Sequence, residues 1–292
     1  MALTCMSSWE HPDLTVRQRD HLGHTYPGAV IEADHSWPFG ITVLEFVHEG
    51  RRLLLKASPT SHHLEREYRA HTRWLGDLDG DVPALVHYDT AANVLVKTFL
   101  PGGIVLGTPQ EHDADCFRQA GSLLARLHHG TRPRTAPHYE EAMTTKTRAW
   151  LGRAGGLVPS EQLTRVAEWL DGFRPQPVDL VPTHGDYQPR NWLVRPDGRI
   201  AVIDFGRAEL RPWYSDLVRM DHHDFALRAD LRAAFRDGYG PEPGPVDEDA
   251  APGRLLDELM QSLGTIVWSR DVGDAVFEEH GRSMLTRSLT RL

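Results

Sequence analysis

The chain is poor in cysteine and contains no long apolar run. Cys5 and Cys116 are its two cysteines, too few for a disulfide framework, and nothing else in the sequence supports a single bridge between them. Its longest apolar stretches, such as Leu53–Leu55 and Ala201–Ile203, are far shorter than the ~20 residues that span a bilayer. No secretory signal is expected, since polar and charged residues at 9–13 precede any apolar core. We therefore expect a cytoplasmic protein without a membrane partner.

Lysine is also scarce. The chain has 32 basic residues, of which Lys56, Lys97 and Lys146 are lysines and the other 29 are arginines. A chain that uses arginine almost everywhere draws attention to the positions where it keeps a compact ammonium group. The remaining composition is ordinary: 292 residues, 40% apolar and 25% charged, are typical of a folded globular protein of one large domain or two lobes.

Negative charge is concentrated near the C-terminus. The net charge is −9, and residues 241–280 hold ten acids against Arg254 and Arg270, a local balance of −8. A field of this sign repels nucleic acid and attracts cations, so we expect no nucleic-acid partner. Two interpretations stay open: a solubilising acidic surface and a binding site for a cationic substrate.

Apolar patterns divide the chain into two parts. Short runs at 29–31, 41–47, 53–57 and 94–99 predict strands, with one helix at 64–75, before Pro101-Gly102-Gly103 interrupts the chain. Beyond that point helical periodicity dominates, with long helices expected at 215–237 and 253–291. The sequence therefore predicts an α+β fold. A small strand-rich lobe with one helix (1–100) precedes a larger, mainly helical lobe (101–292).

A hairpin interrupts the helical part. Trp192–Val194 and Ile200–Ile203 flank Asp197-Gly198, the favoured pair for a two-residue hairpin loop. In that register Asn191 lies directly opposite Asp204, with their Cβ atoms about 5 Å apart. An amide oxygen and a carboxylate at this spacing are suitable ligands for Mg²⁺. A loop one residue longer would shift the register but keep the pair close.

Another acid, Asp186, precedes Asn191 by five residues. Taken alone, Asp186 is explained as a turn residue and Asp204 as the cap of a turn before Gly206. Together, at the two ends of one hairpin, they indicate a metal site.

These residues form a recognisable pair of motifs. The segment His184–Val194, followed by Val202–Gly206, resembles the signature of the aminoglycoside phosphotransferase family, which is similar to the protein kinases. The resemblance implies a two-lobed protein-kinase-like fold with an antiparallel sheet in the small lobe. It also implies that Asp186 orients and deprotonates an acceptor hydroxyl. By the same resemblance Asn191 and Asp204 hold Mg²⁺ on the phosphates of ATP, or of GTP.

The same family places a lysine, paired with a helix glutamate, in the small lobe. Lys56 ends the strand at 53–57, where its ammonium would contact the nucleotide phosphates. Glu65 and Glu67 compete as its partner, and because they lie two apart on a helix only one of them faces the lysine. We choose Glu67.

The rest of the nucleotide site is expected from position along the chain. By analogy, Thr98 and Leu100 lie in the hinge that reads the base, and Lys97 stands where the family usually has an apolar residue. Ser36, between the first two strands, could donate a hydrogen bond to a phosphate. Asp216 is expected to brace the catalytic loop from a following helix.

The acidic C-terminal segment suggests the acceptor. In this family, enzymes that inactivate cationic antibiotics carry acidic substrate pockets in their C-terminal helices. We therefore expect a monomeric resistance enzyme for an aminoglycoside or a tuberactinomycin-type cyclic peptide such as capreomycin or viomycin. The expected substrate-binding acids are Asp257, Glu258, Asp271, Asp274, Glu278 and Glu279. A metabolic kinase acting on choline or a sugar, and a nucleotide-binding protein without catalysis, are the alternatives.

Overall fold

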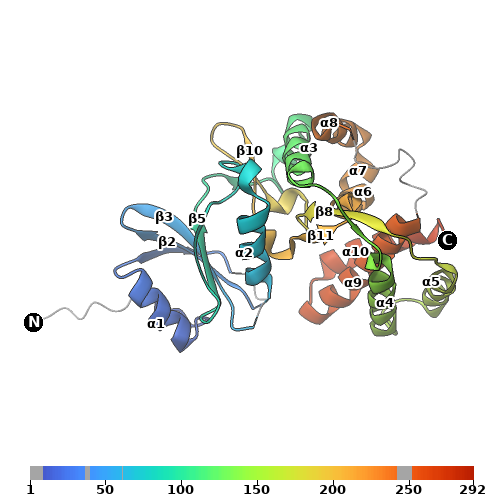
Figure 1. Ribbon diagram of the computed structural model, residues 1–292, viewed down its shortest axis with the longest axis horizontal. Helices are drawn as coiled ribbons and strands as arrows, with labels where there is room; N and C mark the ends of the chain where they lie inside the picture. The colour runs from blue at the N-terminus through green and yellow to red at the C-terminus, as the bar shows by residue number, and fades with distance from the viewer. Residues whose placement is uncertain (1–8, 37–39, 61, 242–251) are drawn as a thin grey trace, which may run out of the picture. The chain divides into compact units, whose positions relative to one another are not determined.

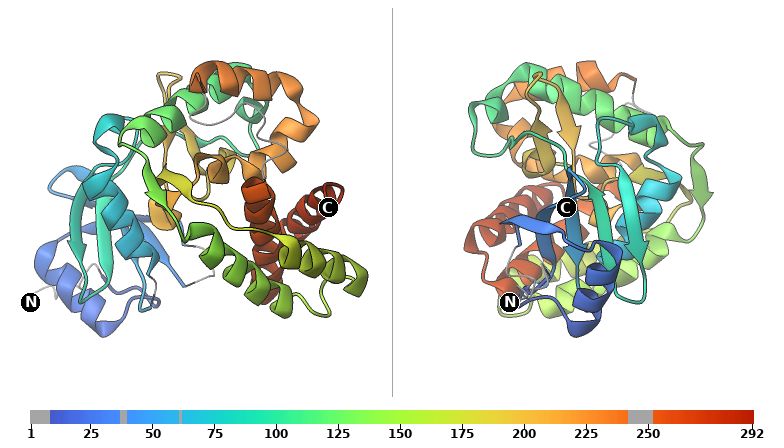
Figure 2. Two further views of the ribbon diagram at one scale, coloured as in Figure 1. Left: turned by 45° about the vertical axis from the view of Figure 1, so that its right-hand side comes forward. Right: turned by 90° about the vertical axis from the view of Figure 1, so that its left-hand side faces the viewer.

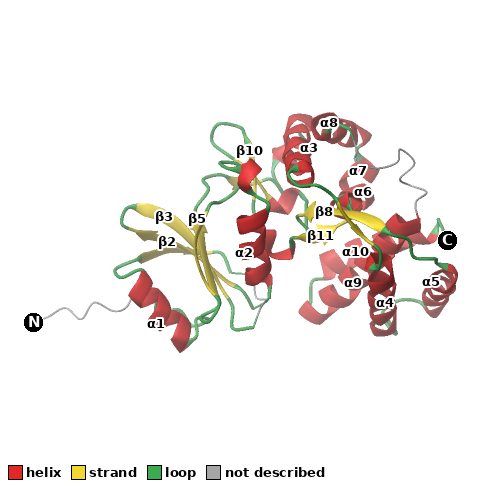
Figure 3. Cartoon of the chain, viewed as in Figure 1, coloured by secondary structure: helices red, strands yellow, loops and turns green. Residues whose placement is uncertain are grey.

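The chain folds as two compact units. The computed structural model describes residues 9–36, 40–60, 62–241 and 252–292. The first unit runs up to Thr108 and also includes Arg190–Ala208, and the second comprises Pro109–Pro189 and Glu209–Leu292. The sequence-based division at residue 100 leaves the 190–208 segment in the C-terminal lobe, whereas here it packs with the N-terminal unit. Strands predominate in the first unit and helices in the second, so the predicted α+β fold is confirmed (Figure 3).

An antiparallel sheet of five strands forms the centre of the first unit, in the order β1-β2-β3-β5-β4. Glu49 and Gly50, both with positive φ, form the two-residue turn between β2 and β3, in which His48 pairs with Arg51. Two consecutive positive φ angles give a turn whose twist matches that of the strands. The strands are β1 (Val30–Asp34), β2 (Thr42–His48), β3 (Arg51–Ala57), β4 (Leu85–Asp89) and β5 (Val94–Thr98).

The two helices of this unit use the two faces of the sheet. Leu22 of α1 (Val16–Thr25) belongs to the apolar core that also contains Phe46 and Leu55. Glu67 of α2 (His63–Arg73) instead bonds to side chains that alternate with those core residues along β3 and β5. Figure 1 shows α1 and α2 beside the sheet. The helix α1, which begins with a capping box at Thr15, is an addition to the single helix expected from the sequence.

The hairpin of the first unit differs in register from the prediction. Its strands β9 (Trp192–Val194) and β10 (Ile200–Val202) pair Val194 with Ile200, and β6 (Gly103–Ile104) flanks β9. Arg195 N–H donates to the Arg199 carbonyl at 2.9 Å, so the loop has three residues, with Gly198 at φ 81°. A turn followed by a left-handed glycine favours this longer loop. The direct opposition of Asn191 and Asp204 was therefore wrong: the Asn191 carbonyl accepts from the Ile203 N–H at 3.0 Å, and Asp204 comes one residue later.

The second unit is mainly helical, around a small sheet in the order β11-β8-β7. Its strands are β7 (Arg134–Ala136), β8 (Val178–Thr183) and β11 (Glu209–Arg211). Its helices are α3 (Ala114–His129), α4 (Tyr139–Arg153), α5 (Ser160–Gly172), α6 (Val218–His222), α7 (Asp224–Leu227), α8 (Ala229–Tyr239), α9 (Pro252–Val272) and α10 (Ala275–Leu289). Short 3₁₀ turns lie at Gly76–Leu78, Pro109–His112, Pro189–Asn191, Phe205–Arg207 and Trp213–Asp216.

The two long helices predicted at the C-terminus are both divided. The segment 215–237 forms part of a 3₁₀ turn and the separate helices α6, α7 and α8. The segment 253–291 breaks at Gly273, whose φ of 78° cannot continue a helix, and Asp274 then caps α10 by accepting from the Phe277 N–H.

The helices α3 and α8 approach each other unusually closely, and Figures 1 and 2 show them side by side. A Cβ atom on Gly238 would lie 1.8 Å from the Arg118 carbonyl oxygen, and one on Gly121 would lie 2.1 Å from the Phe235 carbonyl oxygen. Both contacts are with backbone, which cannot move aside cheaply. Glycine at these positions therefore lets the two helix backbones touch.

Cys116 lies buried in α3, where burial raises the pKa of its thiol to about 12. Cys5 falls outside the described residues. No helix in the part of the chain that the structure describes is both long enough and apolar enough to cross a bilayer.

Candidate active site

Lys56, Glu67 and Asp204 form a connected ionic cluster in the first unit. The Lys56 ammonium donates to Glu67 Oε2 at 2.8 Å and to Asp204 Oδ1 at 2.6 Å. Glu65, the rejected alternative, is instead an exposed residue 3.9 Å from Arg69. The Lys56–Glu67 pairing expected from the sequence is thus the one found. The contact of Lys56 with phosphate stays a prediction.

Charge attraction in this cluster outweighs the cost of burial. Burial alone would lower the pKa of Lys56, but Asp204 and Glu67 raise it above its usual value. Burial alone would raise the pKa of Glu67, but the ammonium groups of Lys56 and Lys97 lower it to about 2. Lys56 and Glu67 are therefore both charged at neutral pH, and a lysine that binds phosphate must be charged.

Lys97 belongs to the same cluster, which sequence reasoning missed. Its side chain is 1% exposed, and its ammonium donates to Glu67 Oε1. Burial lowers the pKa of Lys97 in spite of the attraction from Glu67. The scarcity of lysine was the available signal. The signal that would have placed Lys97 beside Glu67 is the register of β5 against β3, which puts Lys97 on the same face of the sheet as Lys56.

Asp204 occupies a strained backbone position at the end of the hairpin. It has a φ of 65° and a ψ of 68°, in the left-handed region that residues other than glycine seldom adopt, and its side chain is 49% exposed. Asn191, at the start of the same hairpin, is buried. One accessible carboxylate and one amide fit the way Mg²⁺ binds, through few protein ligands together with phosphate oxygens. No cluster of three or more His, Cys, Asp or Glu side chains that could hold a metal occurs in the described ranges.

The loop that carries Asp186 is braced in the second unit by a buried carboxylate. Asp216 accepts from the His184 N–H at 2.7 Å, from the Gly185 N–H at 2.6 Å and from His128 Nε2 at 3.1 Å. Burial would raise the pKa of Asp216, but these hydrogen bonds, led by that of His128, hold it below its usual value. The bracing contact expected for Asp216 is found, although Asp216 lies in the 3₁₀ turn Trp213–Asp216 and not on a helix. His128 links its carboxylate to the Tyr239 hydroxyl.

Asp186 itself is buried, and two side chains hold its Oδ1 atom. Gln188 Nε2 donates to Asp186 Oδ1 at 2.5 Å, and Arg219 Nη1 reaches the same atom at 3.2 Å. The guanidinium of Arg219 also lies over the Phe277 ring, 5.7 Å from its centroid. Sequence reasoning did not predict Arg219, although its position three residues after Asp216 places both near the same loop.

The other nucleotide-binding candidates have structural partners. Ser36 Oγ accepts from the Val43 N–H at 2.9 Å and closes the β1–β2 connection, of which residues 37–39 lie outside the described part. Thr98 ends β5 and bonds to Ala84 through both its N–H and its hydroxyl, each at 2.9 Å. Leu100 follows β5 and is partly exposed. A role for these residues in binding phosphate or base stays a prediction.

Most of the acids proposed to bind a cation have partners within the protein. Asp257 and Glu258 are buried on α9, where Glu258 pairs with His222, Arg254 and Arg291. Elsewhere, Asp271 bonds to Arg153, Asp274 caps α10, Glu278 pairs with Arg270 and Arg282, and Glu279 is exposed. The local count of −8 omitted basic partners from other parts of the chain. Four of its ten acids, Glu242, Asp247, Glu248 and Asp249, lie outside the described residues.

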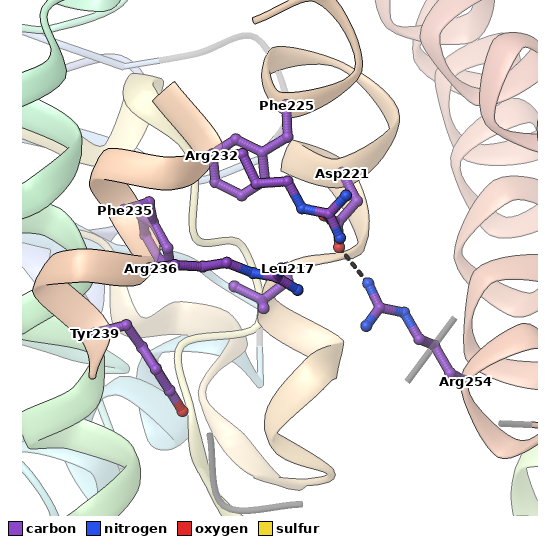
Figure 4. A pocket seen from close by; sticks show the side chains of 8 residues that line it. All are labelled: Leu217, Asp221, Phe225, Arg232, Phe235, Arg236, Tyr239 and Arg254. Atoms are coloured by element: carbon purple, nitrogen blue, oxygen red, sulfur yellow. Dashed lines mark hydrogen bonds and ion pairs between the residues drawn. The ribbon is translucent and has the colours of Figure 1, made fainter. Parts of the chain in front are cut away.

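A small pocket of mixed character lies among α6, α7, α8 and α9 (Figure 4). The Arg254 guanidinium binds the carboxylate of Asp221 across it, and Phe225, Phe235 and Tyr239 supply aromatic walls. Burial raises the pKa of Asp221 in spite of Arg254. The loop carrying Asp186 contributes no residue to its lining.

The chain is similar to known proteins in sequence and in fold. A family model described as the phosphotransferase enzyme family matches residues 42–251. The aminoglycoside 3'-phosphotransferase of Streptomyces ribosidificus is 26% identical over 215 residues, covering 68% of this chain and 81% of that protein.

Two solved structures are similar in fold. One is a thermostable mutant of the aminoglycoside phosphotransferase APH(4)-Ia in ternary complex with ADP and hygromycin B. It has a TM-score of 0.65 and 13% identity over 93% of this chain and 97% of that one. The other is the macrolide 2'-phosphotransferase MphH of Brachybacterium faecium, with a TM-score of 0.59 and 20% identity over 91% and 95%. The family model spans well over half of the chain, which therefore belongs to the phosphotransferase enzyme family and uses an alcohol group as acceptor.

Proposed function

We propose that this enzyme transfers the γ-phosphate of ATP to a hydroxyl of a cationic antibiotic and thereby confers resistance. The observation that carries the proposal is the cluster of Lys56, Glu67 and Asp204, which pairs a buried ammonium with an accessible carboxylate. GTP is the alternative donor. We place the reaction in the cytoplasm, carried out by a monomer.

In this proposal the nucleotide is held by the first unit. Lys56, oriented by Glu67, contacts the phosphates, while Asn191 and Asp204 would hold Mg²⁺. The metal, when bound, supplies positive charge to the phosphate oxygens. Thr98 and Leu100 contact the base, and Ser36 donates to a phosphate.

The acceptor is activated by the second unit. Asp186 accepts the proton of the attacking hydroxyl, a task for a carboxylate within hydrogen-bond reach of it. Gln188 and Arg219 fix its carboxylate, and Asp216 fixes the loop through two backbone N–H groups. The residues contribute positioning and electrostatic stabilisation, the main requirements of phosphoryl transfer.

The class of acceptor is supported by the relatives. They are described as acting on aminoglycosides or macrolides, and one was solved with hygromycin B. We propose an aminoglycoside or a tuberactinomycin-type cyclic peptide such as capreomycin or viomycin. A phosphate adds roughly −1.5 to −2 charges to such a cation, which weakens its attraction to RNA.

A metabolic small-molecule kinase acting on choline or a sugar is the second candidate. It is favoured by the internal ion pairs of Glu258 and Glu278, which leave less acidic surface for a polycation than the sequence suggests.

A panel of acceptors separates the two candidates. Purified enzyme with Mg²⁺ and ATP, or GTP, is assayed for nucleotide turnover with aminoglycosides, capreomycin, viomycin, choline and common sugars. A host expressing the gene is grown on each antibiotic in parallel. We expect turnover and protected growth with at least one cationic antibiotic. Faster turnover of choline or a sugar than of every antibiotic, without protection of growth, would establish the metabolic kinase.

A further inference from the structure

Two lysines from neighbouring strands reach the same buried carboxylate. In the antiparallel pairing of β3 with β5, Leu54 lies opposite Lys97 and Lys56 lies opposite Leu95. Opposed residues share a face of the sheet, and so do residues two apart on one strand, so Lys56 and Lys97 project from the same face. Both side chains end at Glu67 of α2.

Each lysine takes a different oxygen of Glu67. Lys56 donates to Oε2 at 2.8 Å and Lys97 donates to Oε1. Glu67 and Lys97 are each 1% exposed, so neither charge is screened by water at the surface. Two charge-assisted bonds on the two oxygens fix the orientation of the carboxylate more tightly than one bond can.

The charges of the cluster alternate along a single series: Asp204, Lys56, Glu67, Lys97. With Lys97 the formal charges of the four side chains cancel, and without it they sum to −1. Besides bonding to Glu67, the ammonium of Lys97 repels the ammonium of Lys56, because like charges interact strongly in a buried cluster. This repulsion offsets part of the attraction that Glu67 exerts on Lys56 and leaves Lys56 more able to turn toward a phosphate.

We propose that Lys97 is a positioning residue of the nucleotide site. It holds the Glu67 oxygen that Lys56 does not use, so that Glu67 orients Lys56 toward the phosphates without drawing it away from them. The inference rests on the proposed use of a nucleoside triphosphate, and it is independent of which alcohol is phosphorylated. It also explains why a chain rich in arginine keeps lysine here, since a single buried carboxylate oxygen matches a compact ammonium group.

The test uses the full-length enzyme and measures binding of Mg²⁺-ATP, and in parallel Mg²⁺-GTP, by calorimetry without any acceptor. Lys97→Met should weaken nucleotide binding by about ten- to a hundred-fold, the range typical of residues that orient a ligand-bearing side chain. In turnover assays the KM for nucleotide should rise while the KM for the acceptor stays unchanged. Lys146→Met, which changes an exposed lysine of α4, is the matched control and should leave nucleotide binding at the wild-type value.

A double-mutant cycle separates positioning from direct contact and also covers the case in which Lys97→Met does not fold. Glu67→Gln keeps an oxygen for Lys56 and removes the charge that Lys97 neutralises. If Lys97 acts through Glu67, the double variant binds nucleotide as tightly as Glu67→Gln alone. A further loss of affinity in the double variant would show that Lys97 touches the nucleotide itself, which overturns the proposal.

Two more outcomes are decisive. Unchanged nucleotide affinity in Lys97→Met, with only a lower melting temperature, would reduce Lys97 to a purely structural residue and overturn the proposal. Normal binding of Mg²⁺-ATP by the wild type with no antibiotic phosphorylated would instead overturn the proposed antibiotic substrate and leave this inference standing.

Discussion

At the scale of single residues, the two acids of the site are held in contrasting ways. Asp186 is buried, and Gln188 and Arg219 both donate to its carboxylate. Asp204 is half exposed, pairs with Lys56, and has a left-handed backbone. A fixed carboxylate suits the acceptance of one proton from a positioned hydroxyl, and an accessible one suits a ligand that arrives with the nucleotide.

Replacing Asp186 by asparagine should slow the enzyme without unfolding it. The variant keeps the shape of the side chain and loses the acceptor for the hydroxyl proton, a contribution typically worth about 10²–10⁴-fold in kcat. Steady-state kinetics checks the rate, and circular dichroism checks the fold. Asp230→Asn, at an exposed position of α8, is the control and should retain wild-type turnover. Near wild-type turnover in Asp186→Asn would remove this residue from the mechanism.

Asparagine is also the informative replacement at Asp204. Asn tolerates the left-handed conformation, whereas alanine would add backbone strain to the loss of the carboxylate. We expect Asp204→Asn to lose most of its turnover. The Mg²⁺ concentration that gives half the maximal rate should rise by about tenfold or more. A magnesium titration measures this, with Asp197→Asn in the turn of the same hairpin as control. Identical titrations for the two variants would exclude Asp204 as a ligand.

Residues close together in the sequence were predictable from their spacing, whereas contacts between distant elements were predicted only where the family resemblance supplied them, as for Lys56 with Glu67. Asp186, Asn191 and Asp204 lie within one loop and hairpin, so their spacing alone indicates a site. Lys97 contacts Glu67 within the first unit and Arg219 contacts Asp186 within the second, and both contacts depend on strand register and helix placement. No local pattern encodes either of those.

At the scale of elements, the predictions of hairpin register and helix length failed at single residues with an unusual backbone conformation. One extra residue in the hairpin loop, with glycine in the left-handed region, moved Asn191 opposite Ile203. One left-handed Gly273 divided a predicted helix into α9 and α10. Apolar periodicity continues through such positions, because it reports which face is buried and not where the backbone turns.

The close contact of α3 and α8 predicts a strong effect of a single methyl group. Gly238→Ala should lower the free energy of unfolding by about 2–3 kcal/mol or more, because the new Cβ would meet the Arg118 backbone. Gly152→Ala in α4 is the control, since a Cβ there meets nothing within 4 Å. It should be neutral or stabilising by up to ~1 kcal/mol, because alanine is the better helix former. Chemical denaturation compares the two, and equal effects would contradict the close approach.

The buried carboxylate of Glu258 should make the free energy of unfolding depend on pH. Burial opposes its charge, but His222 and Arg291 lower its pKa to about 2, below the ordinary 4.5. A group whose pKa is depressed on folding stabilises the protein above its unfolded pKa, and the contribution is lost as the pH falls toward the folded value. Glu258→Gln should therefore lower the melting temperature at pH 7. The difference from the wild type should shrink from about pH 4.5 downward, as followed by thermal melts across pH. A constant difference would contradict the shifted pKa.

At the scale of the whole molecule, negative charge is plentiful and much of it is paired internally. The net charge is −9, but the acids of α9 and α10 show how poorly a count along the sequence measures a local field. Asp271 and Glu279 keep exposed side chains. They are the acids of the predicted set best placed to meet a cation from solution.

Salt and substitution together test that possibility. For a cationic antibiotic the KM should rise with ionic strength, because exposed charges are screened over about 8–10 Å, and it should rise less for a neutral acceptor. Asp271→Asn combined with Glu279→Gln should raise the antibiotic KM by about two- to fivefold per charge and leave the nucleotide KM unchanged. Asp230→Asn serves as the control. If the antibiotic KM responds neither to ionic strength nor to the double substitution, these acids do not bind the substrate and serve only as a solubilising surface.

The discontinuous first unit has a consequence for biosynthesis. The segment up to Thr108 leaves the ribosome long before Arg190–Ala208, and β6 pairs with β9 only when that later segment emerges. At translation rates of about 5–20 residues per second, the intervening 109–189 takes about 4 to 16 s to synthesise. During that time Lys56 and Glu67 exist without Asp204, and the second unit is being made before the first is complete. The two units therefore mature as an interleaved pair, and the nascent chain cannot finish one before it begins the other.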